Sequence, residues 1–422
     1  MRALTVVRVL LGVEHTVVES VETELPVGGE AVLVVRVRPD RSARSRCSRC
    51  GRRSRGYDRG DGRRRWRGLD FGTVRVVWEA DAPRVSCRVH GVVVAAVPWA
   101  RARSRFTRDF EDTCAWLAAH APGSVVAQLL RVTWRSVNSI VTRVVAEASG
   151  RVDQLAGLRR IGIDEIAFRK GHRYLTCVVD HDTGRLVWAA EGRNTRTLLR
   201  FFDALGAERA GQLTHVSADG AEWIHTVVAQ KAPQATLCLD PFHVVGWGTA
   251  AVDQVRRGLV AGLRATGRGE QATSLKATRW ALVKNPAGLT GDQRTRLAQV
   301  AVTNKSLYRA YLLKEQLRAV FEERGHRGRL LLAGWLAWAR RSRIPAFTKL
   351  AATIDRYRQL IFNTLDDGGV SNARTEATNT HLRVLTRRSY GFHSPDALIA
   401  MAMLTRGGLC PNLPGRMTQL ST

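Results

Sequence analysis

Two different spacings of apolar residues divide the first part of the chain. Apolar and polar residues alternate over residues 1–40 and 69–98, and such alternation predicts strands with one buried face. Over residues 106–147 the apolar residues recur at helical intervals instead. We therefore expect a β-rich module over residues 1–100, followed by a helical module over residues 101–150.

The pattern changes again after this helical module, where strand-like and helix-like segments follow one another. Three apolar segments within residues 159–192 predict strands, and residues 181–184 (His-Asp-Thr-Gly) predict a hairpin turn between the last two. A helix, a strand, a helix and a strand are then expected up to residue 240. Three hairpin-linked strands followed by these elements is the order of an RNase H-like domain.

The rest of the chain is predicted to be helical. Residues 265–370 show a helical pattern almost throughout, and one more helix, over residues 372–388, carries Glu376. The expected fold class is α/β and multidomain, with an RNase H-like catalytic domain interrupted by an all-α insertion. The first part of the catalytic core would span residues 151–264, the insertion 265–370, and the C-terminal helix and tail of the core 371–422.

The net charge of the chain indicates what kind of partner it binds. The 422 residues include 66 Lys and Arg against 37 Asp and Glu, which gives a net charge of +29. A GC-rich genome explains Arg in place of Lys but not the excess of Arg over acidic residues, so we expect a nucleic acid partner. The longest apolar stretch, residues 91–100, is far shorter than the roughly 20 residues of a membrane-spanning helix. We expect no signal peptide and no membrane association, and a cytoplasmic protein located with the nucleoid.

Cysteine spacing adds a metal site to the β-rich module. Seven Cys are an odd number, which argues against a disulfide framework. Cys47 and Cys50 form a CxxC pair, and Cys87 and His90 form a CxxH pair. Unless this spacing is accidental, the two pairs supply the four tetrahedral ligands of a closed, structural Zn²⁺ site without catalysis. We therefore expect a zinc-ribbon-like DNA-binding module, in which the twelve Arg of residues 41–67 suit phosphate contacts.

The helical module has the form of a helix-turn-helix. Residues 124–130 and 134–147 are separated by a short turn, and Thr133 can cap the second helix. Two helices of an ordinary bundle would show the same pattern, so it is the neighbouring basic module that favours DNA binding. The side chains of the second helix that we expect in a major groove are Arg135, Asn138 and Arg143.

Two carboxylates stand in or directly after apolar strands. Asp164 lies within residues 161–168, and Asp219 ends the strand that begins at His215. Burying a carboxylate is costly unless it binds a cation or donors, and ligands bind at strand ends of α/β sheets. Two Mg²⁺ ions need a small cluster of such ligands. On pattern alone, other acidic residues compete for this role: Glu165, Asp180, Asp182, Asp203, Glu222 and Asp240.

Four motifs together resemble one known family. They are GIDEIAFRKGHRYLTCVVD, VSADG, LCLDPFHVV and SNARTEATNTHLRVLTRRSYGF, in this order. As a set, within a resemblance that covers about residues 40–405, they are similar to the ISL3 family of bacterial insertion-sequence transposases. The resemblance implies a DDE triad of Asp164, Asp219 and Glu376 that holds two Mg²⁺ (or Mn²⁺) ions. Asp219 is the least certain of the three, and Asp240 in the DPFHV motif is its reserve.

The same motifs contain basic side chains that are candidates for contact with DNA. His243 belongs to DPFHV, although a lone His after a strand is more often a packing or capping residue than a catalyst. Arg383, Arg387 and Arg388 lie on the helix of Glu376 and are suited to bidentate phosphate contacts. An ordinary basic helix face would have the same composition.

The resemblance also implies a reaction and partners. We expect a transposase that nicks a phosphodiester at the element end and joins the freed 3′-hydroxyl to target DNA. Its partners would be terminal inverted repeats and target DNA, and it would act as a homodimer on DNA. A structure-specific nuclease on the same fold would cut without joining, and a DNA-binding regulator descended from a transposase would do neither. The presence of all three candidate carboxylates argues against the regulator.

Overall fold

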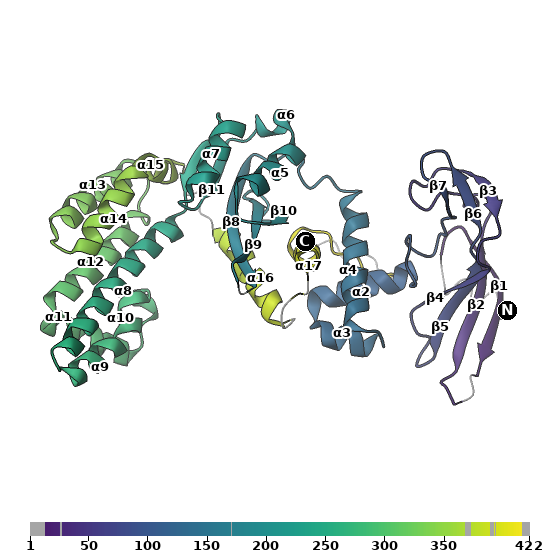
Figure 1. The fold of residues 1–422 in the computed structure, drawn as a ribbon, viewed down its shortest axis with the longest axis horizontal. Coiled ribbons are helices and arrows are strands. Elements are labelled where there is room, and N and C mark those ends of the chain that lie inside the picture. Colours follow the sequence, from purple (N-terminus) through teal and green to yellow (C-terminus); the bar gives the residue numbers. More distant parts are fainter. Residues whose placement is uncertain are drawn as a thin grey trace. The chain divides into compact units, whose positions relative to one another are not determined.

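The protein forms two compact units. A computed structural model describes residues 13–25, 28–169, 171–367, 373–388, 392 and 394–415. The first unit comprises Met1–Asp153 and Arg388–Thr422, and the second comprises Gln154–Arg387. Figure 1 shows the strands and helices of each unit along the chain. No helix within the described ranges combines the length and the apolar character needed to cross a membrane.

Strands of the first unit form a larger and a smaller sheet. The larger has the order β1-β2-β5-β4, built from β1 (Thr16–Glu24), β2 (Val32–Pro39), β4 (Arg63–Arg67) and β5 (Arg75–Asp81). The smaller has the order β3-β6-β7, built from β3 (Arg55–Asp58), β6 (Arg84–Cys87) and β7 (Gly91–Val94). Trp66 and Trp78 pack against Trp99 on the buried face of the larger sheet, with ring centroids 5.6 and 6.1 Å apart. The strands fall largely in the segments where alternation predicts them.

Helices complete the first unit. They are α2 (Arg108–His120), α3 (Gly123–Leu129), α4 (Trp134–Ser149) and α17 (Pro395–Arg406). Thr133 caps α4 as the sequence predicts, because its hydroxyl accepts a hydrogen bond of 3.2 Å from the Ser136 N–H. Residues 371–422, which the sequence assigns to the catalytic core, are divided between the two compact units at Arg388. Helix α17 packs against α4 and α2, where its apolar residues, including Leu398 and Leu404, are buried.

The second unit contains one mixed sheet in the described residues. Its order is β10-β9-β8-β11-β12, with β8 (Arg160–Arg169), β9 (Arg173–Asp180), β10 (Leu186–Glu191), β11 (His215–Ala218) and β12 (Thr236–Leu239). Strands β8, β9 and β10 are antiparallel neighbours, whereas β11 runs parallel to both β8 and β12. Helices α5 (Thr195–Leu205), α6 (Ala207–Ala210) and α7 (Glu222–Lys231) connect the strands and share an apolar core with them, which includes Ile163, Phe201 and Val216.

A helical part follows the sheet, over residues 241–366. It contains α8 (Pro241–Ala265), α9 (Gly269–Ala277), α10 (Arg279–Val283), η1 (Pro286–Gly288), α11 (Gly291–Thr303), α12 (Lys305–Val320), α13 (Gly325–Arg341), α14 (Pro345–Arg356) and α15 (Arg358–Asp366). The predicted boundary at residue 265 coincides with the end of α8. Helix α8 already packs its buried residues, such as Val252 and Val260, into the core that α12, α13 and α14 share.

The chain then returns to the sheet. Helix α16 (Ala373–Arg388) follows the helical part and carries Glu376. Helix α15 lies along β12, where the Asn363 side-chain amide and the Thr364 hydroxyl donate to the carbonyls of Leu237 and Leu239, both at 2.8 Å. An edge strand exposes unpaired backbone groups, and these two side chains satisfy some of them. The helical part is therefore joined to the sheet at the strand that precedes Asp240.

Candidate acidic site and zinc ligands

Three carboxylates lie in or directly after neighbouring strands of the second unit. Asp164 lies in β8, Asp219 directly follows β11, and Asp240 directly follows β12. The register pairs Ser217 with Gly162 and Ala218 with Leu239, so the chain leaves the parallel strands at one edge of the sheet. Ligands of α/β sheets bind at such carboxyl ends. The sheet therefore brings together two of the three predicted triad residues, together with the reserve candidate.

Asp164 is a half-buried acid with a partner on α16. Its Oδ1 accepts from the Glu165 N–H at 2.7 Å, and its Oδ2 accepts from the side-chain amide of Asn379. Burial raises the pKa of Asp164 to about 6; the Glu165 N–H and His243 oppose this rise, and the charges of Asp219 and Asp240 add to it. The Oδ1 atom of Asn379 is buried without a hydrogen-bond partner in the described structure. Sequence analysis assigned Asn379 no role, because only its position on the helix of Glu376 was visible.

Asp240 and His243 form a second polar pair at this edge. Asp240 caps α8: its Oδ1 accepts from the Phe242 N–H at 3.1 Å, and His243 Nδ1 donates to its Oδ2 at 2.8 Å. The hydrogen bond to Asp240 raises the pKa of His243 to about 8, and the charges of Asp164 and Asp219 contribute to this rise. A protonated His243 therefore faces the carboxylates at neutral pH.

Glu165 points to the other face of the sheet, as alternation along the strand predicts. It forms an ion pair with Arg193, which precedes α5, whereas its neighbour Asp164 contacts α16. Burial raises the pKa of Glu165 to about 7, and Asp219 adds to the rise while Arg193 opposes it. The sequence held no signal for Arg193 as the partner.

The other acidic competitors have separate surroundings. Asp180 closes the β9–β10 turn, where it accepts from the Asp182 N–H at 2.9 Å and from the Thr183 hydroxyl at 2.5 Å. Asp182 pairs with Arg160, and Asp203 and Glu222 are exposed on α5 and α7. None of these contacts connects them with Asp164.

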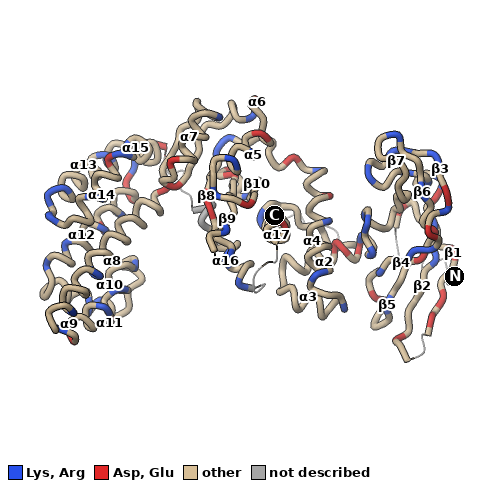
Figure 2. The backbone as a smooth tube through the Cα atoms, in the orientation of Figure 1, with Lys and Arg blue, Asp and Glu red and all other residues tan. Residues whose placement is uncertain are grey.

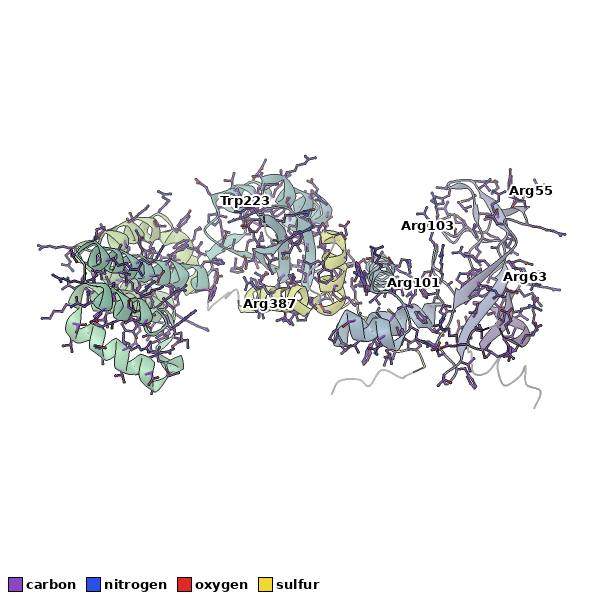
Figure 3. The ribbon with its side chains drawn as sticks, turned by 60° about the horizontal axis from the view of Figure 1, so that its bottom comes forward. Arg55, Arg63, Arg101, Arg103, Trp223 and Arg387 are labelled. Carbon is purple, nitrogen blue, oxygen red and sulfur yellow. The ribbon has the colours of Figure 1, made fainter. Side chains whose placement is uncertain are left out.

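The basic candidates on α16 are only partly described. Glu376 and Arg388 belong to α16, but their side chains lie outside the described residues. Arg383 and Arg387 are exposed, and Figure 3 labels Arg387 on this helix. Both guanidinium groups therefore lie exposed on the helix whose Asn379 contacts Asp164.

The four predicted zinc ligands gather closely in the first unit. The sulfur of Cys47 lies 3.6 Å from His90 Nδ1, and the sulfurs of Cys50 and Cys87 lie 3.8 Å apart. All four ligand atoms are within 4.8 Å of one another, and no other group of three or more His, Cys, Asp or Glu among the described residues is so closely spaced. Such spacing fits tetrahedral Zn²⁺ with Zn–S bonds of about 2.3 Å. Backbone N–H groups of Val89 and His90 lower the pKa of Cys87 to about 6, which favours the thiolate that zinc binds.

Basic residues surround this zinc ribbon. Arg55 begins β3 and Arg84 begins β6, and Figure 2 shows further Lys and Arg in the segments around this small sheet. Figure 3 labels Arg55, and also Arg101 and Arg103 in the segment before α2. Arg103 is exposed, whereas Arg101 is enclosed by Glu111, Asp112 and Glu147. Some of the arginines therefore form ion pairs within the fold, and others are exposed on its surface.

The second helix of the predicted helix-turn-helix presents some of its expected residues. Arg135 is exposed and lies over the ring of Trp134, 5.5 Å from its centroid. Asn138 is half-buried on the same helix. Arg143 instead binds Glu111, which is fully buried, through contacts of 2.8 and 2.6 Å. We therefore leave Arg143 out of the surface available to DNA.

Comparison with known proteins places these features in one family. The model of the ISL3-type DDE transposases, described as "Transposase", matches residues 161–402. The helix-turn-helix domain of transposase family ISL3 matches residues 95–145, and the zinc-finger of transposase IS204/IS1001/IS1096/IS1165 matches residues 43–90. The matched ranges contain the acidic site, α3 with α4, and the four zinc ligands.

Two relatives extend the match over nearly the whole chain. The transposase for insertion sequence element IS1557 of Mycobacterium tuberculosis is 52% identical over 99% of this chain and 98% of its own length. The transposase for insertion sequence element IS1001 of Bordetella parapertussis is 27% identical over 83% of this chain and 86% of its own length. The chain therefore belongs to the ISL3 family of insertion-sequence transposases, with the zinc-ribbon, helix-turn-helix and transposase domains in that order.

Proposed function

We propose that this transposase binds the ends of its insertion sequence and cleaves and joins DNA by a DDE mechanism at Asp164, Asp219 and Glu376. The observation that carries the proposal is the contact between Asn379 of α16 and Asp164 of β8. Glu376 stands three positions before Asn379, and positions three apart share one side of a helix. The contact thus supports a site in which α16 supplies the third carboxylate.

The strand order supports an RNase H-like catalytic core. Three antiparallel strands followed by two parallel ones, in the order β10-β9-β8-β11-β12, place Asp164 on the central strand. The helical part, residues 241–366, enters after β12 and ends just before α16. We propose that it is an all-α insertion in that core.

The acidic cluster fits a divalent cation. Loss of hydration, together with the nearby charges of Asp219 and Asp240, raises the pKa of Asp164 to about 6, so its ionised form lacks compensation that a cation would provide. Oxygen ligands of this kind suit Mg²⁺ or Mn²⁺. We propose that Asp164, Asp219 and Glu376 hold two such ions. When bound, they activate the attacking oxygen and stabilise the charge of the leaving oxygen.

The contacts of Asp240 suit it to holding neighbouring residues in place rather than to binding a metal ion. One of its oxygens accepts from the Phe242 N–H and the other from His243, so Asp240 holds the start of α8 and orients His243. This favours Asp219 as the second ligand. His243, charged at neutral pH, would contact a phosphate oxygen beside the carboxylates and so reduce their repulsion of the DNA backbone.

The reaction has two balanced steps. Water attacks a phosphodiester at the element end, and the P–O bond to the leaving 3′-oxygen breaks, which frees a 3′-hydroxyl. That hydroxyl then attacks a phosphodiester of the target; a new P–O bond forms and the target's own 3′-oxygen leaves. No protein nucleophile takes part, so the residues act by holding ligands and DNA.

DNA recognition is assigned to the first unit. The arginines around the zinc ribbon would contact phosphates, which supply affinity without reading sequence. Arg135 and Asn138 of α4 would face base edges in a major groove, and the zinc would be structural. Arg383, Arg387 and Arg388 of α16 would contact phosphates at the acidic site. We further propose terminal inverted repeats and target DNA as partners, a homodimer on DNA, and a place beside the nucleoid in the cytoplasm.

The test is Mg²⁺-dependent cleavage and joining of a labelled fragment that carries the element's own ends. A transposase yields both free 3′-ends and joined products. Cleavage without joining would point to a structure-specific nuclease, and specific binding without either reaction would point to a regulator. Either result would overturn the proposed function.

A further inference from the structure

Three aromatic side chains hold the backbone directly after β11. His225 of α7 donates from Nε2 to the Asp219 carbonyl at 2.8 Å, and the Tyr357 hydroxyl donates to the Gly220 carbonyl at 3.0 Å. The ring of Trp247 from α8 lies against Gly220. The Tyr357 ring centroid is 5.8 Å from those of both His225 and Trp247. We call His225, Trp247 and Tyr357 the Asp219 clamp.

Gly220 leaves no room for a side chain in this clamp. A Cβ at this position would lie 2.6 Å from Cζ2 and 3.0 Å from Cη2 of Trp247. Real Cβ atoms do not approach other atoms so closely, and an indole ring cannot bend away as a flexible chain can. Gly220 is thus required by space rather than by an unusual backbone angle, and any larger residue must move either the ring or the backbone of Asp219.

Two members of the clamp belong to the helical part. Trp247 and Tyr357 both pack against the apolar core that α8 and α12 to α14 share. They reach Gly220 from distant parts of the chain: Trp247 lies on α8, and Tyr357 is separated from Gly220 by 137 positions. The ring positions are therefore set by packing inside the helical part. Through them, that part holds the segment that carries Asp219.

We propose that Trp247 and Tyr357 are positioning residues that fix Asp219 for cation binding, so that the helical part acts on catalysis through the Asp219 clamp. This inference rests on the proposed role of Asp219 as a ligand. A metal ligand must be held within about 0.5 Å of its productive position, and a segment directly after a strand needs outside contacts to be so rigid. Backbone hydrogen bonds on both Asp219 and Gly220 supply those contacts.

The experiment is a double-mutant cycle on the full-length chain with Gly220→Ala and Trp247→Leu. Gly220→Ala should weaken Mn²⁺ binding, measured by electron paramagnetic resonance without DNA, by about 10- to 100-fold, the usual effect of losing an outer-shell contact. Cleavage should need correspondingly more Mg²⁺, while end binding stays unchanged. Trp247→Leu alone should weaken Mn²⁺ binding less than Gly220→Ala does, because it removes one clamp contact without pushing the Asp219 backbone. In the double variant the added carbon no longer meets the ring, so Mn²⁺ binding should be better than in Gly220→Ala and no better than in Trp247→Leu. The matched control, Gly246→Ala, changes a glycine of α8 with nothing within 4 Å of the added carbon and should leave both readouts unchanged.

A second pair of variants covers the case in which Gly220→Ala does not fold. Tyr357→Phe deletes only the hydroxyl and should raise the half-saturating Mn²⁺ concentration about 10-fold. Tyr308→Phe, on a half-buried ring of α12, is the matched control. Wild-type Mn²⁺ affinity in Tyr357→Phe, or a folded double variant no better than Gly220→Ala, would overturn the clamp. An active Asp219→Ala variant would instead remove the proposed ligand itself, so the two failures are distinguishable.

Discussion

The zinc ligands and the acidic site are assembled in opposite ways. Four zinc ligands come from two short motifs within 44 residues, and their atoms already lie within 4.8 Å of one another. The acidic site draws on β8, β11, β12 and α16, and its described carboxylates do not gather so closely. The zinc ligands are held close by the short loops of their two motifs, whereas carboxylates from distant elements repel until a cation joins them. A site made of local motifs is thus visible in sequence, and a site made of distant elements needs the fold.

The largest effect is expected at the local site. Cys47→Ser with Cys87→Ser should abolish the binding of about one zinc per chain, which in such domains contributes on the order of 10 kcal/mol to folding. The β3-β6-β7 sheet should be lost, and with it the binding of element ends. Metal analysis and circular dichroism of the purified protein measure this. Stoichiometric zinc in the double variant would contradict the assignment.

At the assembled site, single changes should stop chemistry and spare binding. Asp164→Ala, Asp219→Ala and Glu376→Gln should each lower cleavage by about a thousandfold or more, because ligands of one cluster act as a unit. Gel-shift assays should show nearly unchanged end binding. The control is Asp203→Ala, an exposed acid on α5. Glu165, the neighbour of Asp164 on β8, would be a poorer control, because its buried side chain forms an ion pair with Arg193.

Asp240→Ala decides between the two candidates for the second ligand. We expect partial activity, because Asp240 caps α8 and holds His243. An inactive Asp240→Ala beside a fully active Asp219→Ala would move the second ligand to Asp240. Activity in Asp164→Ala or Glu376→Gln would remove the three-carboxylate site.

Two arginines of the helix-turn-helix should have different roles, one in the stability of the first unit and the other in the recognition of DNA. Arg143→Ala leaves the buried Glu111 with fewer cations and should destabilise the first unit by about 3 kcal/mol. Arg135→Ala, at an exposed position, should leave the melting temperature unchanged but reduce the preference for end DNA over random duplex. Thermal melts and competition binding test both. Equal melting temperatures for the two variants would contradict the assigned roles.

The smallest effect concerns pH in the absence of Mg²⁺. The pKa of Asp164 is about 6, above its ordinary value of 3.8. The folded protein therefore favours the protonated carboxyl group, and the stability that this group contributes is lost as the pH rises through 6. Asp164→Asn stays neutral and should exceed the wild type in stability above pH 6, by on the order of 2–3 kcal/mol. Melting curves from pH 5 to pH 8 should show the difference grow and then level off. Added Mg²⁺ should stabilise the wild type only. A difference independent of pH would show that the carboxylate is not the cause.

Much of the local structure could be predicted from the sequence. The three strands that begin the second unit, the turn between β9 and β10, helix α5 and the Thr133 cap all lie where periodicity and capping place them. The zinc ligands were equally accessible, because two pairs with fixed spacing specify four neighbouring donors. The triad came from resemblance, since six other acidic residues matched the pattern as well as Asp164 and Asp219 did.

By itself, the sequence determined the types of elements, their order and the chemistry available at short range. Backbone hydrogen bonding and side-chain periodicity act within a few residues, so each segment carries its own signal. Tertiary structure alone decided that α8 begins the helical part and that α17 packs with α2 and α4. It also decided that Arg143 forms an ion pair with the buried Glu111. It also brought Asn379 to Asp164 and Tyr357 to Gly220. The physical reason is that a buried face or hydrogen-bond donor has many equivalent partners along a chain, and only the packing of the whole selects one.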